Sequence, residues 1–133
     1  LGAALGRAQL ARLPEMQRRR RINASTLADR LADVVTTPVT RSGVEHAWHQ
    51  FTVRVPSDRD GLAARLAAEG CASAAFYRTP AHRYPFVASR SVLKETPVVD
   101  RLAKEALSLP VHPLMSGEEV QGVAEKVRRL ARP

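Results

Sequence analysis

Apolar residues in the first quarter of the chain recur at steps of three and four positions, the spacing of one face of an α-helix. This pattern predicts a long helix from Ala3 to Val34. Pro14 lies inside it and is expected to kink it or to begin a new segment, because proline has no backbone N–H to donate. The turn-like stretch TTPVTRSG, residues 36–43, ends the helix. The residues that carry the helical spacing are Leu10, Leu13, Ala24, Leu27, Leu31 and Val34.

The pattern then changes to a period of two. Phe51, Val53 and Val55 alternate with polar residues, which predicts a half-buried strand over residues 49–55. A second strand is predicted from Cys71 to Tyr77, where small residues indicate close packing against a helix.

A helix is predicted between these two strands. Ser57 is a suitable N-cap, with Asp60 three positions later as in a capping box. Leu62 and Leu66 form a narrow apolar stripe, and Gly70 is expected to end the helix.

The second half of the chain predicts a long loop and two more helices. Residues 78–95 have no clear period, and we expect a loop there. Thr96 followed by Pro97 is a helix start. The stretch LSLPVHP, residues 107–113, predicts a short strand, and Ser116 with Glu119 forms a capping box for the final helix. The face of the Thr96 helix that we expect to be buried contains Val99, Leu102, Ala103 and Ala106.

This order of elements predicts an α+β fold in which helices cover a small sheet of short strands. A chain of 133 residues with 44% hydrophobic residues is long enough for one domain with its own core. The chain begins at Leu1, already inside a helical pattern, so we expect it to be part of a longer protein.

The net charge of +8 raises the question of nucleic-acid binding. Four of the positive charges form one block, Arg18 to Arg21, and aromatic residues make up only 5% of the chain. Proteins that bind single strands place aromatic stacking surfaces beside their cations. We therefore interpret the block as a solvated or interface-lining helix face.

The single Cys71 is typical of a reducing cytoplasm, and no apolar run has the length of a membrane span.

Few residues form a pattern that points to chemistry. No nucleophile, zinc-protease or phosphate-loop motif is present. His46 and His49 are candidate metal ligands by proximity, but no cysteine or carboxylate accompanies them, and we expect both to bond locally. The stretch FYRTPAHRYPF, residues 76–86, follows a predicted strand and is a candidate ligand-facing loop. The alternative is that Tyr77 and Tyr84 are amphipathic side chains with surface hydroxyls.

Four stretches of the chain together resemble the C-terminal domain of the DegT/StrS family of sugar aminotransferases. They are AALGRAQLARLPEMQRRRRINA, HAWHQFTVRVPSDRDGLAARLAAEG, FYRTPAHRYP and EALSLPVHPLMSGEEVQGV, and they occur in the family's order over almost the whole chain. The third matches a Y-x-x-P-x-H pattern at Tyr77, Pro80 and His82. Phe76 stands where family members commonly have histidine, which puts a substrate contact there in doubt. Leu27 replaces a frequent tyrosine, a change that we expect to repack the core.

The resemblance implies a pyridoxal-phosphate enzyme of the aspartate-aminotransferase fold, usually a cytoplasmic homodimer. Such an enzyme moves an amino group from glutamate or glutamine to a keto sugar nucleotide or a cyclitol. Residues 1–133 would be its C-terminal small domain, and residues 1–36 the long helix that enters from the large domain. The large domain would hold pyridoxal 5'-phosphate through a lysine.

On this hypothesis the chain contributes no catalytic, cofactor-binding or metal-binding residue, and the isolated domain is inactive. Tyr77 and His82 are then the candidate substrate-binding residues. A further possibility within the family is dehydration, because some relatives replace the Schiff-base lysine and perform that reaction instead. The alternative hypothesis is a stand-alone basic module that binds nucleic acid or an acidic partner.

Overall fold

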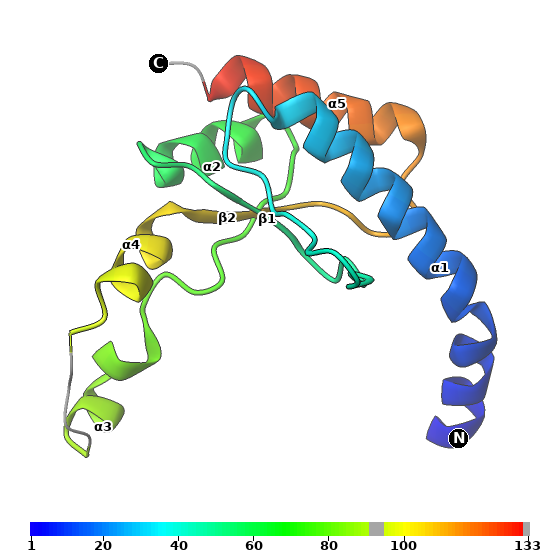
Figure 1. Cartoon of the computed structure of the whole chain (residues 1–133), viewed down its shortest axis with the longest axis horizontal. Helices are drawn as coiled ribbons and strands as arrows, with labels where there is room; N and C mark the ends of the chain where they lie inside the picture. Colours follow the sequence, from blue (N-terminus) through cyan, green and yellow to red (C-terminus); the bar gives the residue numbers. More distant parts are fainter. Residues whose placement is uncertain (91–94, 132–133) are drawn as a thin grey trace.

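The computed structural model describes residues 1–90 and 95–131. The predicted α+β class and the small sheet are confirmed. Figure 1 shows an arch with the two strands at its centre, the first half of α1 on one side and α3 and α4 on the other. The elements are α1 (Gly2–Leu31), β1 (Phe51–Arg54), α2 (Arg59–Ala68), the 3₁₀ turn η1 (Ala81–Arg83), α3 (Pro85–Ala88), α4 (Pro97–Glu105), β2 (Ala106–Leu109) and α5 (Gly117–Leu130).

The long first helix is continuous through Pro14. The expectation that a new segment begins there is therefore wrong. The proline lies in the exposed half of α1, where water can bond the carbonyl that lacks a helical partner. Leu5 and Leu10 are 63% and 66% exposed in this half. The second half of α1 packs on α5 and buries Leu27 and Leu31, so this half anchors the helix.

The sheet consists of β1 and β2 in antiparallel pairing. The strands predicted over residues 49–55 and within residues 107–113 are confirmed, although β1 and β2 have only four residues each. Phe51 and Val53 face the core and are fully buried, as the period of two indicated. The other members of the core include Leu62, Leu66, Leu107, Val120 and Val127.

The predicted strand from Cys71 to Tyr77 is wrong. Within the described residues this segment joins the sheet through one bridge, in which Ala74 and Ser108 exchange backbone hydrogen bonds of 3.0 and 2.7 Å. Its small side chains give little of the cross-strand packing that stabilises a longer ladder. The segment therefore continues along β2 as extended chain and leads into the loop of residues 76–86.

The helix ends follow local sequence signals with one exception. Ser116 and Glu119 form the predicted capping box, and Gly70, with a φ of +71°, follows the end of α2 as predicted. The N-cap of α2 is Asp58 rather than Ser57, and its side chain accepts a 3.1 Å hydrogen bond from the Gly61 N–H. Both residue types cap helices, so the choice depends on the backbone, which turns left-handed at Asp58.

Helix α4 begins at Pro97 as predicted, but no residue of its expected buried face is fully buried. Val99 and Leu102 are 46% and 37% exposed, and Glu105 is its buried residue. The helix meets the sheet mainly through its C-terminal end, where the Arg59 guanidinium donates to the carbonyls of Ala103 and Ala106 at 3.1 and 2.7 Å. The apolar side of α4 therefore borders a hollow instead of the core.

Candidate functional site

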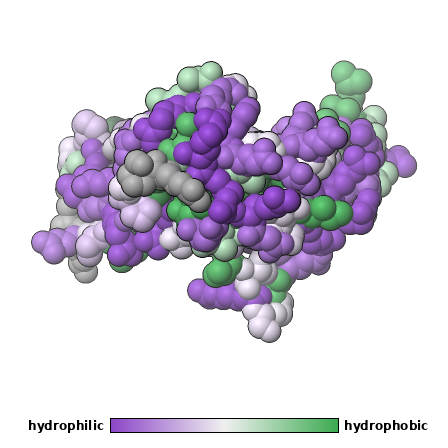
Figure 2. All heavy atoms as spheres, turned by 90° about the horizontal axis from the view of Figure 1, so that it is seen from above, coloured by the Kyte–Doolittle hydropathy of each residue, from purple (hydrophilic) through white to green (hydrophobic). Residues whose placement is uncertain are grey.

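The concave side of the arch contains the face of the sheet that is turned away from the core. Thr52 and Arg54 on β1 lie opposite Ser108 and Ala106 on β2, and the Thr52 and Ser108 hydroxyls are 2.8 Å apart. The opposite, convex side is mainly hydrophilic over α1, α2 and α5 (Figure 2). Two cavities lie over the concave face and share Phe76 in their walls.

The larger cavity, of about 510 Å³, lies between the loop, α4 and the sheet. Tyr77 and Pro80 line it from the loop, and Leu102 lines it from α4. Arg54 lines it from the sheet, where its Nε donates to the Glu105 carboxylate at 2.8 Å. An apolar wall with a few polar groups is the usual make-up of a small-molecule site. Tyr77 is 75% exposed, so its hydroxyl is accessible to a ligand.

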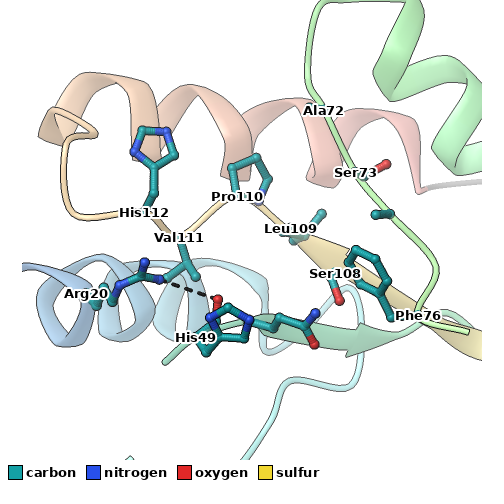
Figure 3. A pocket seen from close by; sticks show the side chains of 12 residues that line it. Arg20, His49, Ala72, Ser73, Phe76, Ser108, Leu109, Pro110, Val111 and His112 are labelled. Atoms are coloured by element: carbon teal, nitrogen blue, oxygen red, sulfur yellow. Dashed lines mark hydrogen bonds between the residues drawn. The ribbon is translucent and has the colours of Figure 1, made fainter. Parts of the chain in front are cut away.

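The smaller cavity, of about 400 Å³, lies where α1 meets the ends of both strands (Figure 3). Arg20 lines it and donates to the Trp48 and His49 carbonyls at 3.0 and 3.4 Å. His46 accepts a 2.9 Å hydrogen bond from the Trp48 N–H on its Nδ1, which confirms the local bonding expected of it. Among the described residues, no group of three or more His, Cys, Asp or Glu side chains is arranged to hold a metal ion.

His82 lies on the η1 turn, outside the lining of the larger cavity. Its Nε2 is 3.1 Å from the Thr96 hydroxyl and 3.7 Å from the Asp100 carboxylate. The structure therefore brings Tyr77 to the cavity and His82 to the N-terminal end of α4. Their shared contact with one substrate stays a prediction.

Asp100 holds the loop against α4. Both of its carboxylate oxygens accept hydrogen bonds from the Arg83 guanidinium, at 3.1 and 3.4 Å. This hydrogen bonding keeps the pKa of Asp100 below its ordinary value, and desolvation opposes the effect. Neither Asp100 nor Thr96 was predicted as a site residue, and Thr96 was predicted only as part of a helix start. Their position at the start of a predicted helix indicates a role in that helix and does not indicate a contact with the loop.

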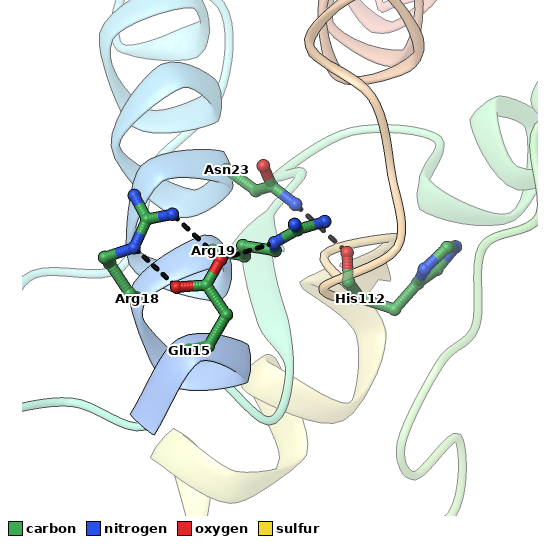
Figure 4. Close-up of polar contacts among 5 residues, drawn as sticks. All are labelled: Glu15, Arg18, Arg19, Asn23 and His112. Carbon is green, nitrogen blue, oxygen red and sulfur yellow. Dashed lines mark hydrogen bonds and ion pairs between the residues drawn. The ribbon is translucent and has the colours of Figure 1, made fainter. Parts of the chain in front are cut away.

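The basic block of residues 18–21 has partners within the chain. Arg18 and Arg19 both donate to Glu15 at 2.8 Å (Figure 4), and they lower the pKa of Glu15 to about 2. Arg20 donates to backbone carbonyls, and Arg21 forms an ion pair with Glu45. These pairings support the interpretation of the block as a solvated or interface-lining helix face. They leave fewer unpaired cations for phosphate than the net charge implies.

Neither described lysine has the surroundings of a Schiff-base lysine. Such a residue needs a desolvated or cation-rich site to be reactive at neutral pH. Lys126 donates to the Glu69 carbonyl at 2.8 Å, and Lys104 lies on the exposed side of α4. Lys94, the third lysine, lies outside the described residues.

Within the part of the chain that the structure describes, no helix combines the length and the apolar character needed to cross a membrane.

A family model described as the DegT/DnrJ/EryC1/StrS aminotransferase family matches residues 1–128. The chain is 36% identical over 135 residues to a pleiotropic regulatory protein of Geobacillus stearothermophilus, covering 98% of this chain and 36% of that protein. It is 33% identical to a UDP-N-acetyl-3-dehydro-alpha-D-glucosamine 3-aminotransferase of Acidithiobacillus ferrooxidans, covering 96% of this chain and 34% of that enzyme. The chain therefore spans about a third of the length of these relatives.

Solved structures are also similar. The S. venezuelae DesV structure in complex with a ketimine intermediate superposes with a TM-score of 0.92 at 31% identity, covering 98% of this chain and 36% of that one. A DegT DnrJ EryC1 StrS aminotransferase from Brucella abortus gives a TM-score of 0.87 at 31% identity, covering 95% and 34%. The similarity extends over nearly the whole chain, from α1 to α5.

Proposed function

Because this chain belongs to the DegT/DnrJ/EryC1/StrS aminotransferase family, we propose that it forms part of a pyridoxal-phosphate-dependent sugar aminotransferase. The proposed enzyme transfers an amino group from glutamate or glutamine to a keto sugar nucleotide or a cyclitol. The observation that carries this proposal is the match over residues 1–128. It is supported by a relative of 33% identity whose name describes amino transfer on a UDP-sugar.

The chain's share of the relatives, about a third, supports a role as the C-terminal small domain. On this proposal residues 1–36 enter from a large domain, and the complete protein is a cytoplasmic homodimer. The exposed first half of α1, with Leu5 and Leu10 in solvent, is the surface that contact with the large domain would bury. The described lysines do not fit covalent attachment of the cofactor, so pyridoxal phosphate would be held by the large domain.

The residues of this chain would orient the substrate. Tyr77 lines the cavity between the loop and α4, and its hydroxyl would donate to or accept from a sugar hydroxyl. His82 lies beside α4 in the same loop. These two side chains would place the reacting carbon of the sugar, and the bond changes belong to the cofactor.

The isolated chain is expected to form no covalent adduct with pyridoxal phosphate. Lys104 is exposed, and Lys126 donates to a backbone carbonyl, so neither has the surroundings that a Schiff-base lysine needs. The measurement is borohydride reduction of the chain mixed with the cofactor, followed by peptide mass mapping. A single stoichiometric adduct at Lys94, Lys104 or Lys126 would contradict the assignment of the cofactor to another domain.

In the complete enzyme, Tyr77→Phe and His82→Ala are expected to lower kcat/KM for the sugar substrate. Loss of one hydrogen bond to a neutral group costs roughly 0.5–1.5 kcal/mol, equivalent to about a two- to twelvefold decrease. The assay is steady-state amino transfer, with the cofactor absorbance and the Tm as controls for folding. Wild-type kinetics in both variants, at an unchanged Tm, would show that the loop is structural.

A further inference from the structure

The surroundings of His82 are unequal at its two ring nitrogens. Nε2 points to the first turn of α4, where it meets the Thr96 hydroxyl at 3.1 Å and the Asp100 carboxylate at 3.7 Å. Nδ1 forms no hydrogen bond with any residue that the structure describes. The side chains of His82 and Asp100 are only 22% and 30% exposed, so the contact is partly shielded from water.

This inequality favours one of the two positions for the proton of the neutral ring. A neutral imidazole carries one N–H, and its other nitrogen presents a lone pair. A lone pair on Nε2 would face the negative charge of Asp100, whereas an N–H at Nε2 would point its positive end to that charge. The Thr96 hydroxyl can then accept the Nε2–H, because a hydroxyl both accepts and donates.

The charge on Asp100 is itself held in place by Arg83. The guanidinium donates to both carboxylate oxygens, and this bonding keeps the pKa of Asp100 low, so that the group remains ionised at neutral pH. The loop thus supplies both His82 and the arginine that fixes the partner of His82. The α4 helix supplies the carboxylate, and its N-cap residue, Thr96, supplies the hydroxyl.

We propose that Asp100, with Thr96, is a positioning residue that holds the proton of the neutral His82 ring on Nε2 and leaves Nδ1 as a hydrogen-bond acceptor. The group that His82 recognises must then be a donor, such as a sugar hydroxyl. The diphosphate of a sugar nucleotide has no proton to donate at neutral pH and does not fit. This last step rests on the proposed function, whereas the position of the proton does not.

The test is ¹⁵N nuclear magnetic resonance of the chain labelled at histidine. Spectra are recorded at about pH 8.5, two units above the ordinary histidine pKa of about 6.5, and the His82 signals are assigned with a His82→Gln variant. We expect a pyrrole-type shift at Nε2 and a pyridine-type shift at Nδ1. Asp100→Asn should raise the share of the Nδ1–H tautomer, and Asp100→Glu should restore the wild-type pattern.

The matched control is Asp33→Asn, which removes a carboxylate bound by two nitrogens of Arg128 at a distance from the loop. It should leave the His82 signals unchanged. If Asp100→Asn does not fold, Thr96→Val replaces it, because loss of the acceptor should also weaken the Nε2–H preference. The proposal is overturned if the wild-type ring carries its proton on Nδ1, or if the ¹⁵N shifts of His82 stay the same in both variants.

A second measurement separates this inference from the proposed function. In the complete enzyme, kcat/KM is compared between the sugar nucleotide and analogues that each lack one hydroxyl. For one deoxy analogue, kcat/KM should fall by about the same factor as it does in the His82→Ala variant. Combining that analogue with the variant should give no further decrease in kcat/KM. If amino transfer is absent while the tautomer follows Asp100, the proposed function fails and the positioning of His82 stands.

Discussion

Replacement of Phe51 by alanine is expected to lower the free energy of unfolding by about 3–5 kcal/mol. The ring is fully buried at the start of β1, and it also packs against the indole of Trp48, with centroids 5.8 Å apart. Truncation removes a large apolar surface and leaves a cavity that two short strands cannot close. Urea denaturation of the chain, followed by circular dichroism, measures the change.

Phe76→Ala is the matched control, because it removes the same ring from the concave face. Phe76 is 49% exposed, so its replacement should cost less than about 1 kcal/mol. Equal losses for the two variants would mean that the concave face is as tightly packed as the core, and the cavities that share Phe76 would then not exist in solution.

The helices and the core strand follow from local signals in the sequence. The capping box at Ser116 needs only residues within one helical turn, and the alternation around Val53 needs only one buried face. The segment after Gly70 was harder to predict, because apolar character alone does not separate a strand from an extended chain. Its hydrogen bonds depend on where Ser108 lies, 34 residues after Ala74.

The candidate site was predictable only in part for the same reason. Tyr77 is the last residue of the strand predicted from Cys71, and residues at the end of a strand are candidates for ligand contact. The contact of His82 with Thr96 joins residues 14 positions apart and depends on how the loop turns back to α4. Periodicity also placed Val99 and Leu102 on a buried face, because the pattern shows that a face is apolar without showing what covers it.

The position of α4 depends on Arg59, whose side chain is 5% exposed. Its guanidinium donates to two carbonyls at the end of α4, those of Ala103 and Ala106. An arginine can reach both because its donors form a rigid planar fork. The same helix carries Asp100 at its other end, so Arg59 supports the surroundings of His82 without touching that residue.

Arg59→Ala is therefore expected to lower the free energy of unfolding by about 3 kcal/mol, since hydrogen bonds from a charged donor contribute about 1.5–3 kcal/mol each and two carbonyls lose their partner. Arg59→Lys keeps the charge but cannot bond both carbonyls, so its loss should be nearly as large. The control is Arg18→Ala, which breaks an ion pair with Glu15 whose side chains are 59% and 49% exposed and should cost at most about 1 kcal/mol. Urea denaturation gives these values, and amide hydrogen exchange shows whether α4 opens first. If Arg59→Ala behaves like the control, α4 is held by other contacts, and the shape of the cavity beside Tyr77 does not depend on this arginine.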